Sequence, residues 1–197
     1  MTFEEAATVP TGATNALHYM RKSEIKAGDK VLINGASGCF GIYAVQLAKL
    51  WGAEVTGVDR GDKLEVIREL GADHLIDYSK EDFTKNGVQY DAIFDVRGDR
   101  VWQMMKSLKK GGRYVLGTPW VGASIKGCFA ALTGGKKFII ELAKEGVDDL
   151  EYVDKLIEEG KLKTVIGKTF TLDEIAEAHR HVESGDKVGH VAIKVAS

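Results

Sequence analysis

The chain has 197 residues, with 27 Lys and Arg against 29 Asp and Glu, a formal net charge of −2 and an apolar content of 44%. This length and composition are typical of one globular domain, or of one domain with a small addition. The near-neutral charge argues against a nucleic-acid binder, because such proteins carry a basic surface that releases counterions from phosphates.

The cysteines and the N-terminus exclude further classes. Cys39 and Cys128 are too few for a disulfide framework, and no C-x-x-C pattern offers zinc a set of ligands. The start, MTFEEAATVP, lacks the basic and apolar parts of a signal peptide. No apolar run reaches the ~20 residues of a membrane helix. We therefore expect a cytoplasmic protein without a metal or a membrane span.

Short apolar segments alternate with segments of helical periodicity along most of the chain. Strands joined through helices need crossover connections and form a parallel sheet that is covered on both faces. The predicted fold class is therefore α/β, a doubly wound parallel sheet with helices on both faces. The predicted elements are an N-terminal helix within 1–22, strands 30–34, 54–59, 74–77, 90–96 and 113–118, and helices 42–51, 63–70 and 100–108.

The pattern changes in the C-terminal part of the chain. Residues 136–142, KKFIIEL, predict one more strand at the edge of the sheet, and residues 148–159 predict a helix. The tail predicts a strand, a helix and a last strand, with Thr171 and Glu174 forming a capping box. We assign residues 1–160 to the main domain and 161–197 to a strand-helix-strand segment. The pattern leaves open whether this tail completes the same sheet or belongs to a different unit.

The turn NGASGCFG, from Asn34 to Gly41, lies between a predicted strand and a predicted helix. Ala36, Gly38 and Gly41 match an A-x-G-x-x-G form of the dinucleotide fingerprint, in which small residues allow the tight turn, the approach of a pyrophosphate and close helix packing. Asp59 ends the next strand about 20 residues further on, as the fingerprint requires. These features predict a dinucleotide site.

The residues after this acid leave the choice of dinucleotide open. Asp59 is placed to accept hydrogen bonds from an adenosine ribose, which favours NAD(H) and repels a 2′-phosphate. Arg60 and Lys63 follow it, and cations at this place favour NADP(H). The same two residues are equally compatible with a solvated helix start.

Four stretches of the chain carry a resemblance to a known family: PTGATNALHYMRKSEIKAGDKVLINGASGCFGIYAVQLAKLWGAEVTGV, LGADHLIDYSKEDF, KKGGRYVLGTP and GKTFTLDEIAEAHRHVESG. Together they resemble the zinc-independent quinone oxidoreductase (zeta-crystallin-like) branch of the medium-chain dehydrogenase/reductase superfamily. The resemblance covers essentially the whole chain and implies a Rossmann fold for the main domain.

The resemblance also implies which residues hold the cofactor. Members of the branch that use NADPH hold its 2′-phosphate with a lysine and a tyrosine that match Lys63 and Tyr78, so NADPH is favoured over NADH, with Asp59 as the counterargument. Asn15 matches a threonine near the nicotinamide, and Cys39 stands where a glycine is usual. The candidate cofactor-binding residues are Asn15, Ser37, Gly38, Cys39, Phe40, Gly41, Asp59, Arg60, Lys63, Tyr78, Gly117 and Thr118.

The activity that the resemblance implies is NAD(P)H-dependent oxidoreduction, with hydride transfer to a quinone or enone and no metal. No catalytic side chain is identified. The family carries an N-terminal GroES-like domain that this chain lacks, so we expect little turnover by the chain alone. We also expect a homodimer through the edge strand 136–142. Two alternatives stay open: a dinucleotide-binding module without catalysis, and an enoyl reductase domain of a larger synthase.

Overall fold

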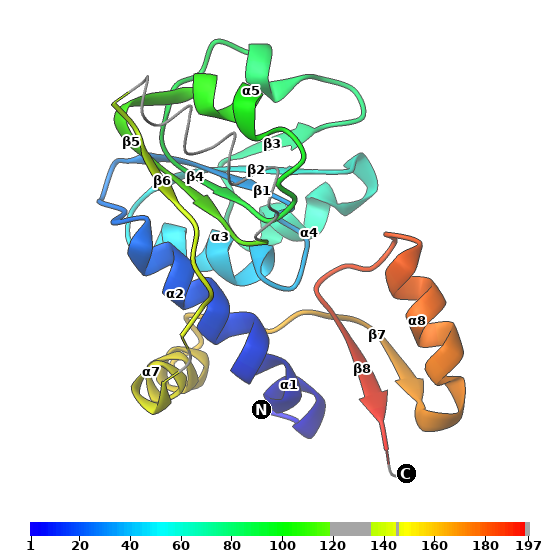
Figure 1. The fold of residues 1–197 in the computed structure, drawn as a ribbon. Coiled ribbons are helices and arrows are strands. Elements are labelled where there is room, and N and C mark those ends of the chain that lie inside the picture. Colours follow the sequence, from blue (N-terminus) through cyan, green and yellow to red (C-terminus); the bar gives the residue numbers. More distant parts are fainter. Residues whose placement is uncertain (119–134, 145, 196–197) are drawn as a thin grey trace.

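The structure is a computed structural model that describes residues 1–118, 135–144 and 146–195 (Figure 1). Six parallel strands form the main sheet in the order β3-β2-β1-β4-β5-β6. The order reverses between β1 and β4, which is the topological switch point of a doubly wound sheet. The predicted fold class is therefore confirmed. The strands are β1 (Lys30–Asn34), β2 (Glu54–Asp59), β3 (His74–Asp77), β4 (Tyr90–Asp95), β5 (Leu108–Leu116) and β6 (Lys137–Ile139).

Three strands differ from their predicted bounds, of which β4 differs only in ending at Asp95, one residue early. β5 begins at Leu108 rather than at 113, because Leu108 pairs with Tyr90 before the register between β4 and β5 shifts. β6 lies at the sheet edge as predicted but is shorter than 136–142. The residues of β6 pair with Arg113–Val115 of β5, and β5 ends one residue later. A longer β6 would therefore find almost no further residues of β5 to pair with at that end.

Helices cover both faces of this sheet, as predicted. Because neighbouring strand residues point to opposite faces, Val31 and Ile33 belong to one buried cluster and Leu32 to the other. The first cluster packs against α2 (Thr14–Lys22), α3 (Gly41–Leu50), α4 (Leu64–Glu69) and α7 (Val147–Glu158). The second packs against α5 (Val101–Lys106).

The predicted N-terminal helix consists of two helices. α1 (Phe3–Thr8) and α2 are joined by a π-helical turn, Val9–Ala13. Pro10 lies in this turn, and a proline has no N–H to donate to a regular helix. None of the helices in the described ranges is long and apolar enough to cross a membrane.

The tail does not extend the main sheet. β7 (Ile166–Thr171) and β8 (His190–Lys194) pair in parallel as a separate two-stranded sheet, and α8 (Ile175–Glu183) packs beside them (Figure 1). The capping box of Thr171 and Glu174 is confirmed. The connection from α8 to β8 runs back to the main domain, where the N–H of Gly189 donates to the carbonyl of Ser37 at 2.7 Å.

Candidate cofactor-binding site

The glycine turn lies at the carboxyl end of β1, beside the switch point. Gly35 has a φ of +83°, a conformation that favours glycine. A Cβ on Gly41 would lie 2.7 Å from the Cα of Ala36, so the first residue of α3 has room only for a hydrogen. The chain therefore turns within a few residues from a buried strand into a buried helix, as the fingerprint requires.

Backbone donors collect at the start of α3. Among the described residues, none accepts a hydrogen bond from the N–H groups of Phe40 or Gly41, while Gly38, just before them, forms a parallel β-bridge with Gly189 of the tail. Unpaired N–H groups at a helix start are suited to hold a phosphate, and the helix dipole adds to this. Cys39 and Phe40 are half-buried. The turn thus fits a pyrophosphate, and the cysteine side chain does not use up its donors.

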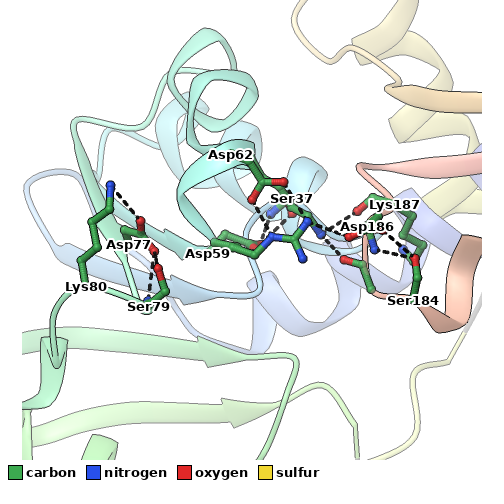
Figure 2. Close-up of polar contacts among 12 residues, drawn as sticks. Ser37, Asp59, Asp62, Asp77, Ser79, Lys80, Ser184, Asp186 and Lys187 are labelled. Atoms are coloured by element: carbon green, nitrogen blue, oxygen red, sulfur yellow. Dashed lines mark hydrogen bonds and ion pairs between the residues drawn. The ribbon is translucent and has the colours of Figure 1, made fainter.

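Asp59 is turned into the glycine turn (Figure 2). Its Oδ2 accepts hydrogen bonds from the Ser37 N–H at 2.9 Å and the Ser37 hydroxyl at 2.7 Å. Its Oδ1 accepts the Arg60 N–H at 2.9 Å, and the residue is 7% exposed. Much of the carboxylate's hydrogen-bonding capacity is therefore spent on the protein itself. Ser37 acts by fixing this carboxylate and the shape of the turn.

The two cations after β2 are both held by partners. The Arg60 guanidinium bridges Asp62, at 2.6 and 2.8 Å, and Asp186, at 2.8 Å. Lys63 is buried, and its Nζ donates to the carbonyls of Gly185 and of Lys187, the latter at 3.0 Å. The interpretation as a solvated helix start is therefore wrong for Lys63, because the tail covers it.

Tyr78 lies on the other side of Asp59, just after β3. Its N–H donates to the Asp59 carbonyl at 3.1 Å, and its half-buried ring lies 5.2 Å from the Arg97 guanidinium. The preceding carboxylate, Asp77, accepts from the N–H and hydroxyl of Ser79 at 3.0 and 2.6 Å (Figure 2). Tyr78 is therefore beside the end of β2, where the resemblance places the 2′-phosphate.

A buried carboxylate joins the strand ends at the switch point. Asp95 accepts hydrogen bonds from the Asn34 amide at 2.8 Å, from the Arg97 N–H at 2.9 Å and from the Tyr114 hydroxyl. Burial, and next the charge of Asp95, raise the pKa of Tyr114 well above its usual value. Asp95 thus ties β1, β4 and β5 together and is a structural carboxylate.

Three predicted residues lie apart from these contacts. Asn15 is half-buried in the first turn of α2, and its side chain has no hydrogen-bond partner within the described ranges. Gly117 and Thr118 directly follow β5, and the Gly117 N–H donates to the Asp95 carbonyl at 2.8 Å. The structure links Gly117 to the switch point, and it shows no hydrogen bond from Asn15 to the glycine turn.

Sequence reasoning missed the connection 184–189 and the residue that follows it. The His190 ring hydrogen-bonds to the Cys39 backbone, while its Nε2 is buried without a partner among the described residues. Burial first, and the charge of Lys187 second, lower the pKa of His190 to about 4. Gly12 is close, since a Cβ there would lie 2.6 Å from that Nε2. These contacts make His190 a structural residue.

A cavity of about 470 Å³ lies between α1 and β8, away from the glycine turn. Its lining is mainly apolar and includes Phe3, Ala7, Val191 and Ile193. It contains none of the predicted cofactor-binding residues, so we base the candidate site on the glycine turn rather than on this cavity.

The sheet order, the switch point and the glycine turn define a Rossmann-type nucleotide-binding domain. A family model described as zinc-binding dehydrogenase matches residues 70–193, more than half of the chain. The chain belongs to this family.

Relatives and solved structures agree with that assignment. The chain is 33% identical to a chloroplastic quinone-oxidoreductase QR1 of Triphysaria versicolor over 83% of its length and 52% of the relative's. It is 30% identical to a 2-methylene-furan-3-one reductase of Solanum lycopersicum, with coverage of 98% and 47%. It superposes on the quinone oxidoreductase from Coxiella burnetii with a TM-score of 0.92 and 31% identity, covering 100% of this chain and 62% of that one. The chain thus spans about half the length of the curated relatives it matches.

The family description implies zinc, which the described residues do not fit. Within 1–118, 135–144 and 146–195, no group of three or more His, Cys, Asp or Glu side chains could hold a metal ion. Cys128 lies outside the described residues.

Proposed function

We propose that the chain is the NADPH-binding part of an oxidoreductase that transfers hydride to a quinone or enone. Its relatives support this reaction class, since they include a quinone oxidoreductase, a furanone reductase and, in Arabidopsis thaliana, an NADPH-dependent alkenal/one oxidoreductase at 30% identity. The bound nicotinamide supplies the hydride, and the protein positions it.

The residues of the chain divide this binding task. The free N–H groups of Phe40 and Gly41 hold the pyrophosphate at the start of α3. Lys63 and Tyr78 lie at the end of β2 and after β3, where they hold the 2′-phosphate of the adenosine ribose. Lys63 has three N–H donors, of which two already point at backbone carbonyls.

The observation that carries the NADPH assignment is the orientation of Asp59. A carboxylate at this position favours NADH when it points outward to the ribose hydroxyls. Here it accepts three hydrogen bonds from Ser37 and Arg60 and is buried. Its repulsion of a 2′-phosphate is therefore reduced, while Arg60 and Lys63 remain beside it as cations.

The assignment is tested by titrating the purified chain with NADPH and NADH separately and following the nucleotide fluorescence. We expect tighter binding of NADPH. Lys63→Met and Tyr78→Phe should each weaken NADPH binding by about tenfold, the loss of one charge-assisted hydrogen bond, and leave NADH binding nearly unchanged. Lys80→Met is the control, because Lys80 is exposed and its ion pair among the described residues is with Asp77. Tighter binding of NADH would instead assign the ribose to Asp59.

We also propose that the chain forms a homodimer and acts in the cytoplasm. β6 is an edge strand with half-buried apolar residues, and an edge of this kind offers unpaired backbone groups to a second copy. The division into residues 1–160 and 161–197 is likewise a proposal, supported by the separate sheet of β7 and β8.

A further inference from the structure

Four charged side chains form one cluster where the tail meets the end of β2. Arg60 and Lys63 come from the main domain, Asp62 lies between them in sequence, and Asp186 comes from the connection between α8 and β8. Their formal charges cancel, two positive against two negative. These four side chains therefore carry no net charge at the place that is expected to receive a doubly charged phosphate.

Asp186 is held in place rather than free to turn away. Its Oδ1 pairs with the Arg60 guanidinium at 2.8 Å, and its Oδ2 accepts the Ser184 hydroxyl at 3.0 Å (Figure 2). The Asp186 N–H donates back to the Ser184 hydroxyl at 3.2 Å.

The backbone on either side of Asp186 is anchored too. Lys63 holds the carbonyls of Gly185 and Lys187, one residue before and one after it. The N–H of Gly189 is bonded to Ser37 in the glycine turn. The carboxylate of Asp186 is thus fixed beside the candidate cofactor site, although it comes from the connection between α8 and β8 in the tail.

We propose that Asp186 is a specificity-determining residue that lowers the preference of this site for 2′-phosphorylated nucleotides. Its carboxylate takes the place on Arg60 that a 2′-phosphate would otherwise use, and a phosphate must compete with it. Asp62 competes as well, but it lies in the same short turn as Arg60, whereas Asp186 reaches Arg60 only through the tail. This inference rests on the proposed function and refines it.

The size of the effect follows from Coulomb's law. A phosphate carries about −1.5 to −2 charges at neutral pH, and removal of one carboxylate leaves the cluster with a net charge of +1. For exposed groups several ångströms apart in water, the gain in affinity corresponds to about threefold to tenfold. Because the groups are exposed, salt screens the interaction, so the gain should shrink as ionic strength rises.

The test measures two adenosine fragments that differ only in the 2′-phosphate, 2′,5′-ADP and 5′-AMP, by calorimetric titration of the full chain. Asp186→Asn should bind 2′,5′-ADP about threefold to tenfold more tightly than the wild type and 5′-AMP equally well. Glu183→Gln is the matched control, since it removes an exposed acid from the same region that forms none of the described ion pairs with Arg60. This control should change neither affinity.

Each outcome decides one question. Equal affinity of wild type and Asp186→Asn for 2′,5′-ADP, with both fragments bound, would overturn the role of Asp186 and leave the proposed function standing. The same gain in Glu183→Gln would also overturn it, because the effect would then be one of net charge alone. Binding of neither fragment by the wild type would overturn the proposed function and this inference together.

Discussion

The Oδ2 atom of Asp59 lies 2.9 Å from the backbone nitrogen of Ser37 and 2.7 Å from its hydroxyl oxygen. This one carboxylate oxygen joins the end of β2 to the glycine turn after β1. Both residues are buried, at 7% and 2% exposure, so water cannot replace either bond. The shape of the turn therefore depends on an acid that the sequence places on the neighbouring strand.

Asp59→Ala should lower the free energy of unfolding by about 2 to 4 kcal/mol, because it leaves buried donors without an acceptor. It should also weaken binding of both NADPH and NADH, since the turn loses its support. Urea denaturation and nucleotide titration measure the two effects. Asp62→Ala removes an exposed carboxylate from the same region and should leave the unfolding free energy nearly unchanged. An equal loss in both variants would show that Asp59 contributes only its charge.

Gly41→Ala should destabilise the chain by about 2 kcal/mol or more, because the added Cβ overlaps the backbone of Ala36. The start of α3 would have to shift, so nucleotide binding should fall as well. Gly146→Ala is the control: nothing lies within 4 Å of its Cβ position, and replacement of a helix-capping glycine costs less than about 1 kcal/mol. Similar denaturation midpoints for the two variants would contradict the close approach at Gly41.

His190 should make the chain less stable in mild acid. Its pKa is about 4 in the folded chain, below the ordinary value of 6.5, so the unfolded chain binds the proton more readily. The contribution of the neutral His190 ring to the free energy of unfolding is complete above pH 6.5. It is lost as the pH falls toward 4, and the loss is about 3 kcal/mol at most. Urea denaturation of the wild type at a series of pH values between these limits measures this loss.

Variants separate His190 from other titrating groups. His190→Asn should have a smaller fall in unfolding free energy between pH 6.5 and 4 than the wild type, whatever its stability at neutral pH. His179→Asn changes an exposed histidine on α8 and should keep the wild-type pH dependence. The same slope in all three proteins would mean that His190 titrates normally.

The edge position of β6 predicts a dimer. Light scattering of the purified chain should give the mass of two chains, because the edge offers unpaired backbone groups and partly apolar side chains. Ile140→Pro, directly after β6, removes one edge N–H and should shift the equilibrium toward monomer. A single-chain mass for the wild type at high protein concentration would rule out this mode of assembly.

Local patterns predicted the fold well where local forces decide it. β1, β2 and β3 have their predicted bounds because each is an apolar run that ends at a turn. The capping box of Thr171 and Glu174 was predictable for the same reason, since its hydrogen bonds join residues three positions apart. The glycine turn was predictable from its pattern of small residues, which fits the tight turn between a strand and a helix. The parallel, doubly wound architecture followed from the alternation of strands and helices.

The candidate site was less predictable because its contacts join distant segments. Nothing in the local pattern shows that Lys63 meets the carbonyl of Gly185, or that Arg60 pairs with Asp186. The orientation of Asp59 depends on Ser37, one crossover away. The length of β6 was overestimated, because a strand extends only as far as its partner and β5 ends at Leu116.

The bond between Lys63 and the carbonyl of Gly185 joins residues 122 positions apart, one in the first half of the sequence and one near its end. During synthesis from the N-terminus, all six strands of the main sheet emerge from the ribosome before the segment that covers Lys63 and Arg60. A nascent chain therefore exposes a cofactor pocket with two uncovered cations and no Asp186 beside them. Nucleotides that reach it at that stage meet a more positive surface than they meet in the finished protein.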